Sequence, residues 1–103
     1  MLLCRGAAET AKELNGRALT IQAGDTLGKN TQRARIVIPD QTVSGLHCSF
    51  AFLPQRGWVV KDENSTNGTF VNDIKLPAGG SAPLRDGAIL KVGKESFEFK
   101  AKQ

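Results

Sequence analysis

The sequence predicts an all-β domain, a sandwich or barrel of short strands. Apolar, β-branched and aromatic residues gather in runs of three to six residues, and turn residues separate these runs. A spacing of about 8–12 residues between such runs is typical of sandwiches and barrels. Only residues 7–14 have the composition of a helix. Since each predicted strand has one apolar face, two sheets have to cover each other to remove both faces from water.

The first half of the chain supplies two of these runs. Residues 17–22 alternate, with Leu19 and Ile21 on one face. Residues 35–38 form a compact β-branched run that ends at a Pro-Asp pair. Residues 7–14 precede an Asn-Gly turn, so the pattern allows either one short helix or a loop between two strands.

The second half predicts a hairpin followed by shorter strands. Residues 48–53 place Cys48, Phe50 and Phe52 on one face, and residues 58–62 follow a Pro-Gln-Arg-Gly turn as the hairpin partner. The remaining predicted strands are residues 69–71 after an Asn-Gly turn, residues 89–92, and residues 96–100 with Phe97 and Phe99 inward.

Composition limits the functions to consider. The 103 residues suit one domain, and the 40% hydrophobic and 23% charged fractions are close to globular averages. No apolar run approaches the roughly 20 residues of a membrane helix, and the apolar start is too short for a signal peptide. We therefore expect a cytoplasmic protein without membrane insertion. The net charge of +4 favours anionic partners, either a phosphopeptide or, weakly, a nucleic acid.

Metal and cofactor chemistry is not expected. Cys4 and Cys48 both lie in apolar surroundings and are predicted to be buried free thiols. A zinc site needs further ligands at short spacing, and His47 with Cys48 has no partner pair. We expect neither a metal nor a cofactor.

Enzymatic motifs are incomplete. Gly28-Lys29 departs from a nucleotide-binding loop in its glycine spacing and in the residue after the lysine. Ser44 and His47 are three residues apart, but no acid is placed to orient the histidine and no nucleophile-elbow glycines flank the serine. We therefore expect no enzymatic activity.

The order of these segments carries more information than any of them alone. Gly28-Lys29 is followed by Ser-x-x-His at Ser44–His47 and then by Ser-Thr-Asn-Gly-Thr at residues 65–69. Together with the framing segments "WVVKDENSTNGTFVND" and "LRDGAILKVG", this order resembles the forkhead-associated (FHA) family. The resemblance covers residues 17–102, and residues 1–4 are a candidate for the first strand. It implies a single domain over residues 1–103, with a core at about 17–102. The implied fold is an eleven-stranded β-sandwich of two twisted, mostly antiparallel sheets.

The resemblance also implies a function, which is binding of phosphothreonine peptides by loops at one end of the sandwich. Ser44 resembles the serine whose hydroxyl donates to the phosphate, Thr66 the residue with a second phosphate contact, and Asn67 the residue that holds the peptide backbone. The resemblance further implies phosphate contacts from Lys29 and from the backbone N–H of Gly45. The residues expected to shape the loops are Gly28, His47, Gly68 and Thr69. The partner is then a protein phosphorylated by a Ser/Thr kinase, and we expect the isolated domain to be a monomer.

Two positions depart from the family pattern. Lys29 stands where the family usually has arginine, which replaces a planar, bidentate donor by a point charge on a flexible stem. Gly45 replaces a side chain that often adds a polar contact. A phospho-independent interaction domain, for example within a secretion or membrane-associated assembly, therefore stays open as an alternative. Nucleic-acid binding has only the charge in its favour and is not expected. Candidates for peptide specificity are Arg33, Arg35 and Thr42.

Overall fold

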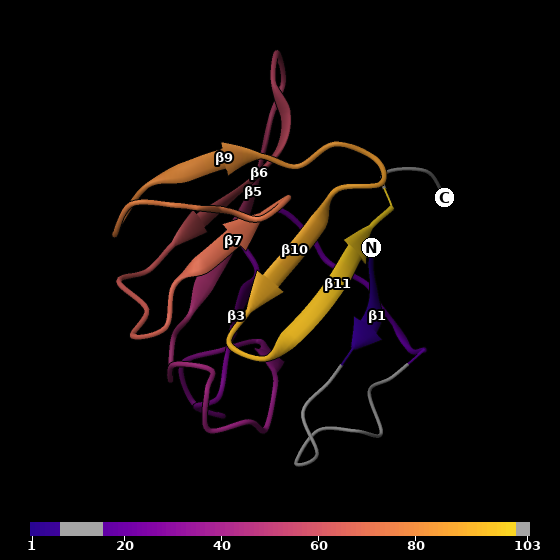
Figure 1. Cartoon of the computed structure of the whole chain (residues 1–103). Coiled ribbons are helices and arrows are strands. Elements are labelled where there is room, and N and C mark those ends of the chain that lie inside the picture. The colour runs from indigo at the N-terminus through magenta and orange to yellow at the C-terminus, as the bar shows by residue number, and fades with distance from the viewer. Residues whose placement is uncertain (7–15, 101–103) are drawn as a thin grey trace.

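The computed structural model describes residues 1–6 and 16–100, which form two packed β-sheets (Figure 1). One sheet has six strands in the order β2-β1-β11-β10-β7-β8, and the other has five in the order β4-β3-β5-β6-β9. The strands of the six-stranded sheet are β1 Leu2–Gly6, β2 Ala18–Leu19, β7 Thr69–Val71, β8 Ile74–Lys75, β10 Ile89–Val92 and β11 Glu95–Phe99. The strands of the five-stranded sheet are β3 Thr26–Gly28, β4 Ile36–Val37, β5 Cys48–Leu53, β6 Gly57–Asp62 and β9 Ser81–Pro83.

This architecture confirms the predicted all-β sandwich, including its eleven strands and its mostly antiparallel pairing. The one parallel pair, β3 with β4, joins Leu27 to Ile36 and Gly28 to Val37. The predicted hairpin is β5 and β6, which pair from Cys48–Asp62 to Leu53–Gly57. The helix allowed for residues 7–14 lies outside the described residues.

The core lies between the two sheets and follows the period-two alternation of the strands. In β11 every second residue is buried, and the predicted inward phenylalanines Phe97 and Phe99 are fully buried. Phe50 is buried on the facing sheet, but Phe52 on the same face of β5 is 51% exposed. The end of this hairpin projects beyond the sandwich (Figure 1), which leaves Phe52 partly exposed. Its ring packs edge-on against Trp58, with 5.6 Å between the ring centroids.

Two sequence expectations need adjustment. Residues 17–22 were predicted as one strand, but only Ala18 and Leu19 form a strand, β2, because β1 pairs with this segment at those two positions alone. Ile21 nevertheless packs in the core. The short strands β3, β8 and β9 were not predicted individually from the residues. Cys4 and Cys48 are buried free cysteines, as predicted, and burial raises the pKa of both thiols.

The ends of the described chain meet at one edge of the sandwich. The amino group of Met1 donates to the carbonyl oxygen of Lys100 at 2.9 Å. The β5–β6 turn lies at the top of Figure 1, and the loops that flank β4 gather at the bottom. Among the described residues, no helix has the length and apolar character needed to cross a bilayer.

Candidate functional site

Two loops are joined by backbone hydrogen bonds at the end of β3. The N–H of Lys29 donates to the carbonyl of Ser44 at 2.9 Å, and the N–H of Asn30 donates to the carbonyl of Gly45 at 3.1 Å. A Cβ at position 28 would lie 2.1 Å from the carbonyl oxygen of Gly45. Only glycine permits this close approach. Gly28 therefore sets the distance between the Lys29 segment and the Ser44 segment.

The hydroxyl of Ser44 links these loops to a third one. The backbone N–H of Thr66 donates to Ser44 Oγ at 2.9 Å. A serine hydroxyl accepts through its lone pairs and still has one hydrogen to donate. The bond from Thr66 thus fixes the oxygen of Ser44 and leaves its hydrogen for an acceptor outside.

His47 lies beneath these loops, fully buried, and connects them. The N–H of Ser44 donates to Nδ1 at 3.0 Å, and Nε2 lies 2.9 Å from the carbonyl oxygen of Gly68. Because a carbonyl only accepts, the proton is on Nε2 and the ring is neutral. Burial lowers the pKa of His47, which favours this neutral form. Since both ring nitrogens are bound to the backbone, His47 is not placed as a base for the Ser44 hydroxyl.

The loop between β6 and β7 is held from inside by Asp62, which sequence analysis missed. Its Oδ1 accepts from the hydroxyls of Ser65 and Thr69, the latter at 2.7 Å. Ser65 Oγ in turn accepts from the N–H of Gly68 at 3.1 Å, where φ is +89°. Burial alone would raise the pKa of Asp62, but hydrogen bonds from Ser65 and Thr69 outweigh it and hold that pKa below its ordinary value. An Asp followed three residues later by Ser is the local signal for this turn.

A second buried acid, also missed, holds Thr42. The Thr42 hydroxyl donates to Asp40 Oδ2 at 2.7 Å and accepts from the N–H of Lys94 at 2.9 Å. The side-chain amide of Asn67 donates to the carbonyl of Thr42 at 2.8 Å. A side-chain hydrogen bond with Glu95, together with those from Thr42, keeps the pKa of Asp40 below its ordinary value. Thr42 thereby joins the turn between β10 and β11 to the loops.

These loops surround a hollow of about 260 Å³, which we call the loop pocket. The residues that line the loop pocket are Lys29, Gln41, Thr42, Val43, Ser44, Gly45, Thr66 and Asn67. All five residues predicted to bind the phosphopeptide are therefore brought together, with Thr42 beside them. The residues predicted to shape the loops are not among the lining residues of the loop pocket and instead hold the loops in place: Gly28, His47, Gly68 and Thr69.

The two arginines considered for specificity are not among the lining residues. Arg35 Nε instead lies 3.1 Å from Asp25 Oδ1. Arg33 is exposed, and its carbonyl accepts from the hydroxyl of Thr26 at 3.2 Å. Of the three specificity candidates, only Thr42 lines the loop pocket.

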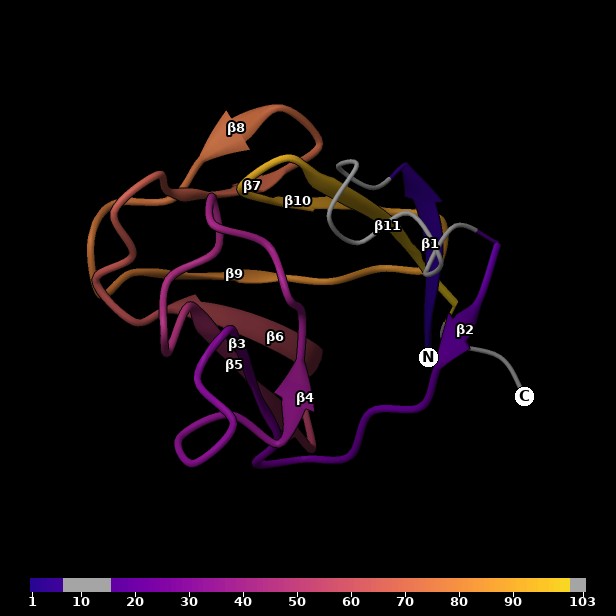
Figure 2. The same cartoon turned by 90° about the horizontal axis from the view of Figure 1, so that it is seen from below.

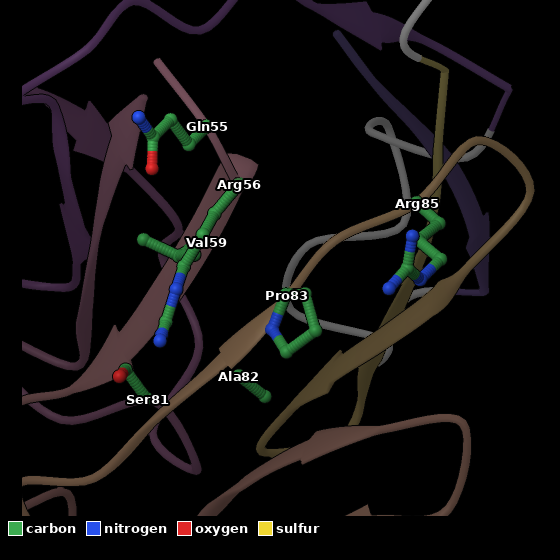
Figure 3. A pocket seen from close by; sticks show the side chains of 7 residues that line it. All are labelled: Gln55, Arg56, Val59, Ser81, Ala82, Pro83 and Arg85. Carbon is green, nitrogen blue, oxygen red and sulfur yellow. The ribbon is translucent and has the colours of Figure 1, made fainter. Parts of the chain in front are cut away.

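Another hollow, of about 330 Å³, lies between β6 and β9 and shares no residue with the loop pocket (Figure 3). Its lining residues are Gln55, Arg56, Val59, Ser81, Ala82, Pro83 and Arg85. Pro83 has no N–H to donate, so the edge strand β9 cannot form a complete set of backbone hydrogen bonds with an added strand.

Within residues 1–6 and 16–100, no three His, Cys, Asp or Glu side chains gather as metal ligands.

Comparisons with known proteins agree with this geometry. E3 ubiquitin-protein ligase DMA2 of Saccharomyces cerevisiae is 33% identical over 85 residues, which cover 67% of this chain but only 16% of that protein. The FHA domain of the CT664 protein from Chlamydia trachomatis superposes with a TM-score of 0.82 at 20% identity, covering 99% of this chain and 96% of that one.

A third relative comes from a structural study of phosphothreonine-dependent FHA domain interactions, and it superposes with a TM-score of 0.78 at 24% identity, covering 99% and 95% of the two chains. At these identities the two solved structures show likeness of fold alone. The family model of the FHA domain matches residues 25–93. Because this match takes in more than half of the 103 residues and the whole loop pocket, the chain belongs to the FHA domain family.

Proposed function

We propose that this chain binds phosphothreonine-containing proteins through the loop pocket. The observation that carries the proposal is the state of Ser44, whose oxygen is fixed by the N–H of Thr66 while its hydrogen is left to donate. Lys29 and Gly45 line the same hollow. FHA domains are phosphopeptide-binding modules, and we assign the phosphopeptide contacts to Ser44, Thr66 and Asn67 on the resemblance of the motifs.

The chemistry of the loop pocket suits a phosphate. A phosphothreonine carries about −1.5 to −2 charges and three strong acceptor oxygens. The Ser44 hydroxyl and the backbone N–H of Gly45 supply donors, and the amine of Lys29 supplies a cation. His47 accepts from the N–H of Ser44 and donates to the carbonyl of Gly68. These two hydrogen bonds order the loops before the ligand binds, which lowers the entropic cost of binding. In this proposal the chain is an interaction module and not an enzyme.

The test is titration of a fluorescent phosphothreonine peptide library and of its unphosphorylated twin. We expect binding of the phosphorylated peptides only. Ser44→Ala should weaken that binding by about 1.5–3 kcal/mol, the range for a hydrogen bond to a charged group. Ser81→Ala, on the edge strand β9 and outside the lining of the loop pocket, is the matched control and should leave the affinity unchanged. Equal binding of both libraries, or none, would reject the proposal.

A second candidate function is phospho-independent interaction within a larger assembly. Two observations favour it: Lys29 replaces the bidentate donor of the family, and the amide of Asn67 is already bound to the carbonyl of Thr42. Lys29→Arg separates the candidates, because it should strengthen phosphopeptide binding if this position contacts phosphate. Partner capture that survives both phosphatase treatment and Ser44→Ala would favour the second candidate.

We further propose that these 103 residues form one domain, with its core at residues 17–102, and that the domain is monomeric in isolation and acts in the cytoplasm. Light scattering at several protein concentrations tests the monomer, and limited proteolysis tests the core. A mass that doubles with concentration would contradict the first expectation, and early cleavage between residues 17 and 100 would contradict the second.

A further inference from the structure

A third hollow is lined by Ser65 and Gly68, which belong to the same loop as Thr66 and Asn67 of the loop pocket. It measures about 390 Å³, and we call it the Lys75 hollow. Its lining residues are Asp62, Ser65, Gly68, Lys75, Leu76, Pro77 and Ala78. Asp62 is only 2% exposed, and its carboxylate accepts hydrogen bonds from the hydroxyls of Ser65 and Thr69. Lys75 is therefore the charged group that this hollow presents to solvent.

Lys75 belongs to a row of cations on the outer face of the six-stranded sheet. In the β7–β8 and β10–β7 pairings, Phe70 lies opposite both Lys75 and Lys91, so the three side chains share one face. The strands β8, β7 and β10 form one layer in Figure 2. The Lys75 side chain reaches Gly68, since its Cε would lie 2.8 Å from a Cβ at that position.

A third lysine, Lys94, is connected to the loop pocket through its backbone. This residue lies in the turn between β10 and β11, and its N–H donates to the hydroxyl of Thr42, which lines the loop pocket. Lys75 therefore lies beside Gly68, the neighbour of Asn67, and the backbone of Lys94 contacts Thr42, while Lys29 lines the pocket itself.

On this face Lys75 and Lys91 are exposed, the carboxylate of Glu98 is engaged by Arg5 and Lys100, and Asp73 in the β7–β8 turn is an exposed acid two residues from Lys75. Asp25, Asp40, Asp62 and Glu95 are buried, so much of the negative charge is inside. Among the described residues, the ion pairs engage Arg5, Arg35 and Lys100, while Lys94 interacts electrostatically with Asp40. Cations clustered on one face repel each other, and an anionic partner relieves that repulsion.

We propose that Lys75, Lys91 and Lys94 select phosphothreonine peptides that carry Asp or Glu close to the phosphothreonine. The phosphate occupies the loop pocket, and a flanking carboxylate lies against Lys75, with Lys91 and Lys94 adding to the attraction. This inference rests on the proposed function and names the class of partner that it serves.

A double-mutant cycle tests the inference. One phosphothreonine peptide has Gln at the four positions on each side, and a set of variants places a single Glu at each position in turn. Each is titrated against the natural chain, against the triple variant Lys75→Gln, Lys91→Gln, Lys94→Gln, and against Lys61→Gln on β6 of the other sheet as a control for charge. Urea denaturation checks that every variant is folded.

We expect Glu on one side of the phosphothreonine to raise affinity by about two- to fivefold, the scale of an exposed ion pair. The gain should shrink as salt rises, because exposed charges are screened. It should vanish in the triple variant, with the Gln peptide far less affected, and persist in Lys61→Gln.

Two outcomes oppose the inference and differ from each other. If the Gln phosphopeptide binds but Glu brings no gain, or the gain survives in the triple variant, the lysines do not select acidic partners and the proposed function stands. If no phosphopeptide binds, the proposed function fails and this inference fails with it.

Discussion

Replacing Thr69 by valine tests how the β6–β7 loop is held. The change removes the hydroxyl that donates to Asp62 Oδ1 at 2.7 Å while keeping the size and branching of the side chain. Thr69 is fully buried and Asp62 is 2% exposed, so water does not readily replace the lost donor. A hydrogen bond to a charged group contributes about 1.5–3 kcal/mol, and we expect Thr69→Val to lower the free energy of unfolding by this amount at pH 7.

The loss should depend on pH in a defined direction. The pKa of Asp62 in the folded chain is lowered from 3.8, so its stabilising contribution is present above 3.8 and is lost as pH falls through the folded pKa. Thr69 is one of the donors that lower this pKa. The difference in unfolding free energy between the natural chain and Thr69→Val should therefore be constant above pH 5 and shrink below 3.8.

Urea denaturation followed by Trp58 fluorescence measures both effects. Thr20→Val, at an exposed threonine, is the control and should change the unfolding free energy by less than about 0.5 kcal/mol. A loss below that limit for Thr69→Val at pH 7 would show that the bond to Asp62 does not hold the loop. A difference that stays the same from pH 7 to pH 3 would show that Asp62 is not the acceptor that matters.

Two further experiments, one substitution and one pH titration, probe the loops. Gly28→Ala should lower the free energy of unfolding by about 1–3 kcal/mol and weaken phosphopeptide binding, because the added methyl meets the carbonyl of Gly45, whereas Gly6→Ala has nothing within 4 Å and should do neither. Equal urea midpoints for the two variants would contradict this. The imidazole of His47, the sole histidine, should keep its neutral NMR shifts below pH 6.5, because burial lowers its pKa. The unfolded chain takes up that proton first, so stability should fall as pH drops below 6.5, and titration at the ordinary value would refute the buried tautomer.

The sequence predicted the long strands, and also the short strands β4 and β7, but it did not predict β3, β8 and β9. In β5 and β11 the alternation of apolar residues extends over five or six positions, which is enough to identify a period of two. β8 has only two residues, and β3 and β9 have three each, which is too short to show an alternation of apolar and polar residues. Phe52 shows the remaining weakness, because its face was predicted but not the projection of the hairpin beyond the core.

For the site, the motif order predicted which residues gather but not how they are held. Ser44, Thr66 and Asn67 follow from local sequence, because loops at one end of a sandwich converge. Asp40 and Lys94 are more than fifty residues apart in the chain and act through Thr42, so no local pattern connects them. The close approach of Gly28 to Gly45 likewise depends on the tertiary structure, and the sequence of neither segment predicts it.

The bond between Met1 and Lys100 has a consequence for architecture. A polypeptide that enters this domain at its first strand leaves it within hydrogen-bonding distance of the entry point. Such a domain can be inserted into an exposed loop of a host protein without separating the two ends of that loop. It should also tolerate circular permutation, in which its two ends are joined and new termini are placed in another turn, for example at Gln55. The fold is thus suited to being carried as an insert as readily as at the end of a longer chain.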